Sequence, residues 1–155
     1  MFSNNLILKI LDYIDNNLYK KITIEELSKT FYFNKDYIMR VFKREINTTI
    51  IEYINKKRIF SSLNELKNTN NSILKIAINN GFISQEYYSE TFTKIIGVNP
   101  LTYRKFTKVG SNISYEKINI IRNNIAKLNL ELNIINEYRR NVPTKQVKTL
   151  SLLKK

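Results

Sequence analysis

The feature that most constrains this chain is an internal repeat, in which one pattern of apolar and small residues occurs twice, 49 to 50 residues apart. The positions Ile24, Leu27, Ser28 and Phe33 are matched by Ile73, Ile76, Ala77 and Phe82, and then Ile38, Phe42 and Ile46 by Tyr88, Phe92 and Ile96. Each copy predicts a short helix, a tight turn and a longer helix, which together make a helix-turn-helix unit. Helix pairs are common, so one copy would carry little weight, but two copies in register predict a tandem pair.

Helix-capping signals place the boundaries of seven predicted helices. The segments Thr23-Ile24-Glu25-Glu26 and Thr49-Ile50-Ile51-Glu52 have the spacing of a capping box, in which threonine and glutamate satisfy early backbone N–H groups. With Asn34, Ser72, Ser84 and Asn99-Pro100 as further caps, we expect helices at 4–17, 24–30, 35–46, 50–67, 73–80, 85–96 and 100–106. Only 3 glycines and 2 prolines interrupt the chain. The expected fold is therefore all-α, with two helix-turn-helix subdomains joined by a long central helix.

Composition narrows the possible functions. The net charge is +13, from 26 basic and 13 acidic side chains, which suits a polyanionic partner such as nucleic acid or an anionic membrane surface. The chain has no Cys or His, glycine-rich phosphate loop or paired-carboxylate motif, so we expect no enzyme activity, cofactor or metal site. It also has no signal peptide and no apolar run of about 18 residues, so we expect a cytoplasmic protein without membrane contact.

Several motifs share their order and spacing with a known family. They are Thr23-Ile24-Glu25-Glu26-Leu27-Ser28, Asp36-Tyr37-Ile38-Met39-Arg40-Val41-Phe42-Lys43-Arg44-Glu45, Glu52-Tyr53-Ile54-Asn55 leading to Arg58, Ile76-Ala77, Gly81-Phe82, Gln85-Glu86-Tyr87-Tyr88-Ser89, Phe92, and Gly97-Val98-Asn99-Pro100 with Tyr103-Arg104. Over residues 4–106 the chain thus resembles the AraC/XylS family of bacterial transcription regulators. The resemblance implies seven helices, with recognition helices at 35–46 and 84–96. Because few residues precede the first helix, the chain resembles stand-alone members without an N-terminal sensing domain.

The exposed faces of the two recognition helices supply the candidate DNA-binding residues. They are Lys35, Asp36, Met39, Arg40, Lys43, Arg44, Ser84, Gln85, Glu86, Tyr87, Ser89, Glu90 and Lys94. On the first helix, Arg40 can make a bidentate contact with guanine, and Met39 can pack against a thymine methyl. On the second helix, Gln85 can bind adenine, and Glu86 or Glu90 can accept a hydrogen bond from the cytosine amine. Lys43 and Arg44 are expected to meet phosphates or water.

Three residues depart from the family's pattern. Glu90 stands where the family usually has arginine, so we expect the second unit to contribute less affinity or to bind an unusual half-site. Tyr32 occupies the turn position that Gly81 has in the second copy, at a cost on the order of 1 kcal/mol if the backbone there needs positive φ. Asn80 replaces an apolar residue, which predicts a looser core in the second unit.

The residues after the second unit form a separate tail. We expect a linker at 107–113 and, within 114–155, an amphipathic helix followed by a frayed end at 145–155. Apolar residues at Ile118, Ile121, Ile125, Leu128, Leu132 and Ile135 alternate in steps of three and four, like a coiled-coil seam. This 118–135 stripe can dock on the DNA-binding core or pair with a second copy in a homodimer.

The sequence predicts a sequence-specific regulator that binds double-stranded DNA through two adjacent major grooves. The resemblance implies an activator, with RNA polymerase as a further partner. The alternative is a non-specific or decoy DNA-binding protein, or a modulator that acts by binding another regulator. Steep salt dependence with little sequence preference would favour this alternative.

Overall fold

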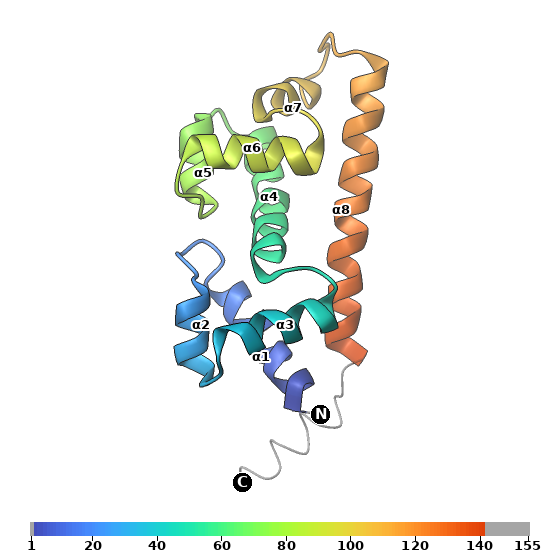
Figure 1. The fold of residues 1–155 in the computed structure, drawn as a ribbon. Coiled ribbons are helices and arrows are strands. Elements are labelled where there is room, and N and C mark those ends of the chain that lie inside the picture. The colour runs from blue at the N-terminus through green and yellow to red at the C-terminus, as the bar shows by residue number, and fades with distance from the viewer. Residues whose placement is uncertain (1, 142–155) are drawn as a thin grey trace.

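The structure, a computed structural model, describes residues 2–141, which form eight helices and no strand (Figure 1). The helices are α1 Phe2–Asn16, α2 Ile24–Phe31, α3 Lys35–Ile46, α4 Ile50–Asn68, α5 Ile73–Asn79, α6 Gln85–Ile96, α7 Pro100–Phe106 and α8 Tyr115–Asn141. The seven predicted helices and the helical tail are therefore confirmed, as is the all-α class. The predicted frayed end at 145–155 lies outside the described residues.

Local sequence explains where the helices of the first unit begin and end. The Thr23 hydroxyl accepts from the backbone N–H of Glu26 at 3.1 Å to start α2, and the Asn34 side chain accepts from that of Asp36 at 2.8 Å to start α3. Between them, Tyr32 closes α2 in the left-handed conformation, with φ 59°. The turn therefore does need positive φ at a residue with a side chain, which carries the expected strain.

The linking helix α4 opens on a complete capping box. The Thr49 hydroxyl accepts from the backbone N–H of Glu52, and the Glu52 carboxylate accepts from that of Thr49, both at 3.1 Å. Eight residues of α4 are buried, which are Ile50, Tyr53, Ile54, Arg58, Ile59, Ser62, Leu63 and Leu66. Such burial around the helix fits a central element that packs against both units.

Asn80 is a polar residue in the core of the second unit, and its side chain is hydrogen-bonded there. Asn80 is 3% exposed, and its side-chain amide donates to the Ile76 carbonyl at 2.8 Å and to the Glu65 carboxylate at 3.3 Å. Glu65 also accepts from the amides of Asn71 and Asn79, at 3.1 and 3.0 Å. The buried side-chain amide of Asn80 is thus hydrogen-bonded. A polar residue at this position therefore gives no reason to expect a looser core in the second unit.

Arg58 on α4 lies at the junction of the two units. Its guanidinium donates to the carbonyls of Leu18 and Lys20, each at 2.7 Å, and lies 6.0 Å from the ring centroid of Phe82 in the second unit. Gly81 has φ +86°, and a Cβ there would come within 2.8 Å of Arg58 Nε and 2.9 Å of the Leu18 carbonyl. Glycine at 81 therefore permits both the tight turn and this close approach.

The tail helix α8 packs along α4 and α6, so its apolar stripe is covered within the chain (Figure 1). Ile121, Leu128, Leu132 and Ile135 are buried against the core. The structure therefore has the docked arrangement, the first of the two alternatives. A homodimer through the 118–135 stripe stays a prediction, and it would require α8 to leave this position.

Within residues 2–141, no helix has both the length and the apolar character that crossing a membrane requires.

Candidate nucleic-acid interface

The exposed face of α3 carries most of the first set of candidate residues. Ile38, Val41, Phe42 and Ile46 are buried, which leaves the opposite side of the helix in solvent. That side presents Lys35, Asp36, Met39, Arg40, Lys43 and Arg44, all of them exposed. The sequence therefore placed these six side chains correctly on the accessible face.

Three cations on this face have neighbours within the protein. Lys35 Nζ lies 3.1 Å from the Glu25 carboxylate, and Arg44 Nε lies 3.1 Å from that of Glu45. The Arg40 guanidinium lies over the Tyr37 ring, 5.6 Å from its centroid. Exposed ion pairs of this kind contribute little to stability, so their cations can exchange partners for phosphates at small cost.

On α6 the candidate residues divide into two roles. Gln85, Glu86, Glu90 and Lys94 are exposed and Ser89 is half-buried, whereas Tyr88, Phe92 and Ile96 face the core. The Ser84 hydroxyl caps the helix by accepting from the backbone N–H of Tyr87 at 3.1 Å. The Tyr87 hydroxyl accepts from the Asn55 amide at 2.8 Å, which ties α6 to α4. Ser84 therefore has the capping role that the sequence predicts, whereas the contact of Tyr87 with α4 is a structural role that no sequence pattern indicated.

The two recognition faces differ in charge. Helix α3 carries four basic and two acidic side chains, whereas α6 carries one basic and two acidic side chains. Arg40 and Glu90 occupy matching positions in the two copies, 50 residues apart, and both are exposed. Of the two recognition helices, α3 therefore carries net positive charge and α6 net negative charge.

The two helices lie in comparable positions on their units. In Figure 1, α3 starts beside α2 and α6 starts beside α5, and both helices run toward α8. Helix α4 connects the two units and contacts both α3 and α6. The repeat in the sequence is thus also a repeat in space.

A groove of about 490 Å³ lies between α4, α6 and α8 beside the second recognition face. Glu90 and Lys94 of α6 line it together with Lys127 and Glu131 of α8, and Glu131 is paired with Lys56 of α4 at 2.9 Å. No sequence pattern places these α8 residues beside α6, because an amphipathic stripe identifies a buried face but not the helix that it packs against.

Among the residues that the structure describes, no three Asp or Glu side chains gather in a group that could hold a metal ion.

Comparison with known proteins agrees with this geometry. A family model described as a helix-turn-helix domain matches residues 27–105. The chain is 31% identical to the multiple antibiotic resistance protein MarA of Escherichia coli (strain K12) over 103 residues, 66% of this chain and 81% of MarA. It is 29% identical over 103 residues to the HTH-type transcriptional activator AarP of Providencia stuartii, which is 66% of this chain and 76% of AarP.

A solved structure has the same fold. The C-terminal domain of AraT, a response regulator from Geobacillus stearothermophilus, superposes with a TM-score of 0.63 at 24% identity. The superposition covers 71% of this chain and 92% of that domain. The shared part is large enough to hold both helix-turn-helix units.

Proposed function

This chain belongs to the AraC-type helix-turn-helix family, and from that premise we propose that it is a sequence-specific regulator of transcription that binds duplex DNA. In this proposal α3 and α6 of one monomer enter adjacent major grooves. We assign DNA binding to residues 4–106, with 107–113 as the linker to α8.

The observation that carries the proposal is the pair of exposed recognition faces held by one continuous helix. An α-helix fits the major groove, where base edges present a distinguishable pattern of donors and acceptors. Helix α4 has 19 residues, which at 1.5 Å per residue gives about 28 Å. With the width of the flanking units added, this approaches the roughly 34 Å between successive major grooves on one DNA face.

Individual contacts follow from residue chemistry. Arg40 is proposed to donate to guanine, with Met39 against a thymine methyl and Lys43 against a phosphate. On the second helix, Gln85 is proposed to bind adenine, and Glu90 to accept from a cytosine amine. We further propose activation through contact with RNA polymerase, in keeping with the name of the activator AarP.

A second candidate function is favoured by the acidic face of α6. Glu86 and Glu90 would repel phosphates wherever they find no cytosine amine. In that case the chain binds DNA with little sequence preference, or acts by binding another regulator. The two candidates differ in whether the second unit contributes to sequence preference.

Selection of bound duplexes from a random pool at fixed salt tests the proposal. We expect a motif with two parts about one helical turn apart. Arg40→Ala should remove preference in one part and Gln85→Ala in the other, whereas Arg122→Ala, an exposed arginine of α8, should leave both intact. Selection of no motif by the wild-type chain would favour the second candidate.

A further inference from the structure

Helix α8 contacts the second recognition helix at its C-terminal end. The Asn124 amide donates to the Ile96 carbonyl at 2.9 Å. Ile120 and Asn124 also lie directly against Gly97, where an added Cβ would come within 2.5 and 2.7 Å of their side chains. The start of α8 is therefore fitted closely to the end of α6.

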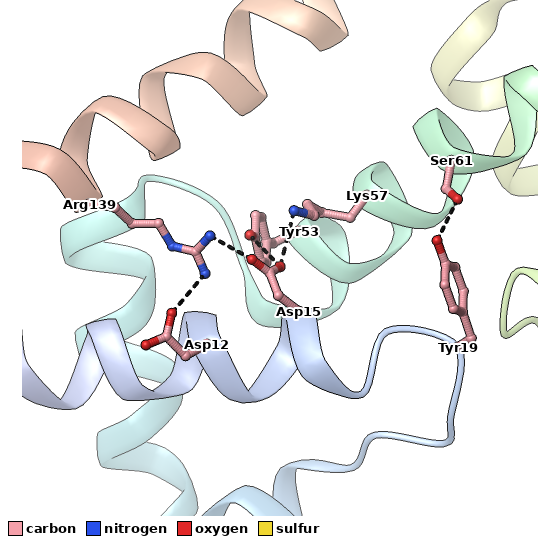
Figure 2. Close-up of polar contacts among 7 residues, drawn as sticks. All are labelled: Asp12, Asp15, Tyr19, Tyr53, Lys57, Ser61 and Arg139. Atoms are coloured by element: carbon pink, nitrogen blue, oxygen red, sulfur yellow. Dashed lines mark hydrogen bonds and ion pairs between the residues drawn. The ribbon is translucent and has the colours of Figure 1, made fainter.

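The other end of α8 contacts the first unit. Arg139 forms ion pairs with Asp15 and Asp12 of α1, the second at 3.6 Å, as Figure 2 shows. The Tyr138 hydroxyl donates to the Asn4 side chain at 3.3 Å. Burial, with the carboxylate of Glu45 on α3 nearby, raises the pKa of Tyr138 to about 12. The end of α8 thus lies beside α1 and the first recognition helix.

Between these ends α8 is attached to α4. Lys56 pairs with Glu131 at 2.9 Å, and Leu128 and Leu132 are buried. Asp15 joins the same arrangement from α1, since it accepts from Lys57 of α4 at 3.0 Å. The two units are therefore connected twice, through α4 and through α8, which run side by side in Figure 1.

Two parallel connections restrict motions that one connection permits. A single linking helix with the Arg58 contact at its middle resists compression, but it resists poorly a rotation of one unit about the α4 axis. A second helix, displaced to one side and attached to both units, opposes that rotation. The angle and separation of α3 and α6 then depend on α8.

We propose that α8 is a brace that fixes the spacing of the two recognition helices, so that the chain discriminates between operators by the number of base pairs separating the half-sites. Arg139 is the positioning residue that anchors the brace to the first unit. The proposal rests on the proposed function, because spacing matters only if both units bind one duplex. One added base pair moves a half-site by about 3.4 Å and turns it by about 35°, which a rigid pair of helices cannot follow.

The first test measures geometry without DNA. Because the chain has no Cys, Lys29→Cys on α2 and Lys75→Cys on α5 introduce two exposed labelling sites away from the recognition faces. With a nitroxide spin label on each cysteine, double electron–electron resonance then gives the distribution of distances between the two labels. We expect a narrow distribution for the otherwise unchanged chain and a broad one for Arg139→Met, which keeps an unbranched apolar stem but removes the charged guanidinium.

A matched control lies next to Arg139. Arg140 is exposed and pairs with Glu137 of α8 itself, so Arg140→Met removes the same charge without freeing α8 from α1. We expect its distance distribution to match that of the unchanged chain. If Arg139→Met also gives the unchanged distribution, the brace is overturned, whatever the DNA measurements show.

The second test measures affinity for the selected operator and for copies with one or two base pairs added between the half-sites. We expect the wild-type chain to lose at least about tenfold in affinity per added pair, since tethered binding is lost when geometry forbids simultaneous contact. Arg139→Met should bind the original operator more weakly and lose severalfold less on insertion. An equal loss in wild type and Arg139→Met would overturn the proposal, whereas a wild-type chain that binds no duplex would instead remove the proposed function.

Discussion

Arg58 and Arg104 hold equivalent loops in the two halves of the chain. Arg58 donates from Nε and Nη2 to two carbonyls in the loop between α1 and α2. Arg104 of α7 donates from the same two atoms to the carbonyl of Leu66, in the last turn of α4, at 3.1 Å and to that of Asn71, in the loop before α5, at 2.7 Å. The segment before each helix-turn-helix unit is thus held by a guanidinium from the helix that follows that unit, α4 in the first half and α7 in the second.

Arg58→Lys should destabilise the fold by about 1–3 kcal/mol. Lysine offers one ammonium group in place of the planar fork, so either the buried carbonyl of Leu18 or the partly buried carbonyl of Lys20 loses its donor. Urea unfolding followed by circular dichroism measures the effect, and Arg122→Lys, on an exposed face of α8, provides the control. Equal stability of the two variants would show that the paired carbonyls contribute nothing.

How far the sequence predicts this molecule depends on the range of each interaction. The caps at Thr49 and Asn34 act over two or three residues, so local pattern was sufficient to locate α3 and α4. The partners of Arg58 lie 38 and 40 residues away in the chain, and no local signal identifies them. The pairing of Arg139 with Asp15 spans 124 residues and depends on how α8 docks.

The candidate interface shows the same division. Periodicity identified the exposed side of α6, because burial follows the helical repeat. It did not show that the Tyr87 hydroxyl would turn to Asn55 of α4, since that depends on the angle between two helices. Nor did it show that Glu65 would satisfy Asn80, which therefore looked like a defect in the core.

Tyr32→Gly should stabilise the chain by up to about 1 kcal/mol. Tyr32 has φ 59°, which is costly for a residue with a Cβ, and its side chain is 92% exposed, so little packing is lost. Thermal and urea unfolding measure the gain. Asn47 also has positive φ, at 65°, but asparagine tolerates that region, so Asn47→Gly should gain less. A destabilised Tyr32→Gly variant would mean that the exposed ring packs in solution.

Glu65→Ala should cost about 2 kcal/mol, because three side-chain amides lose a charged acceptor. Glu65→Gln keeps one acceptor oxygen and should cost less. Asn80→Ala in the Glu65→Ala background should then add less than it does alone, since part of its contribution is already gone. Additive losses in this double-mutant cycle, measured by urea unfolding, would contradict the hydrogen-bonded cluster.

Glu52 should make stability depend on pH below about 5. The hydroxyl of Thr48 and the backbone N–H of Thr49 lower the pKa of Glu52 in the folded chain. A carboxyl with a lowered pKa stabilises the folded state above its unfolded pKa, and this contribution is lost as pH falls through the folded pKa. The wild type should therefore be more stable than Glu52→Gln at pH 7, and the difference in unfolding free energy should shrink on acidification. A difference that stays constant from pH 7 to pH 3 would exclude this role.

Glu90→Arg should strengthen binding to duplex DNA and make it more sensitive to salt. Glu90 is exposed at the position that matches Arg40, so the change removes a negative charge from the second recognition face and supplies a cation there. One new phosphate contact steepens the slope of log K against log salt by about 0.9. Filter binding at several salt concentrations gives this slope, and Glu116→Arg, in the exposed first turn of α8, makes the same change in net charge away from both recognition faces. Equal slopes for the two variants would mean that α6 does not approach the duplex, because only a local contact distinguishes Glu90 from any other acidic residue of the surface.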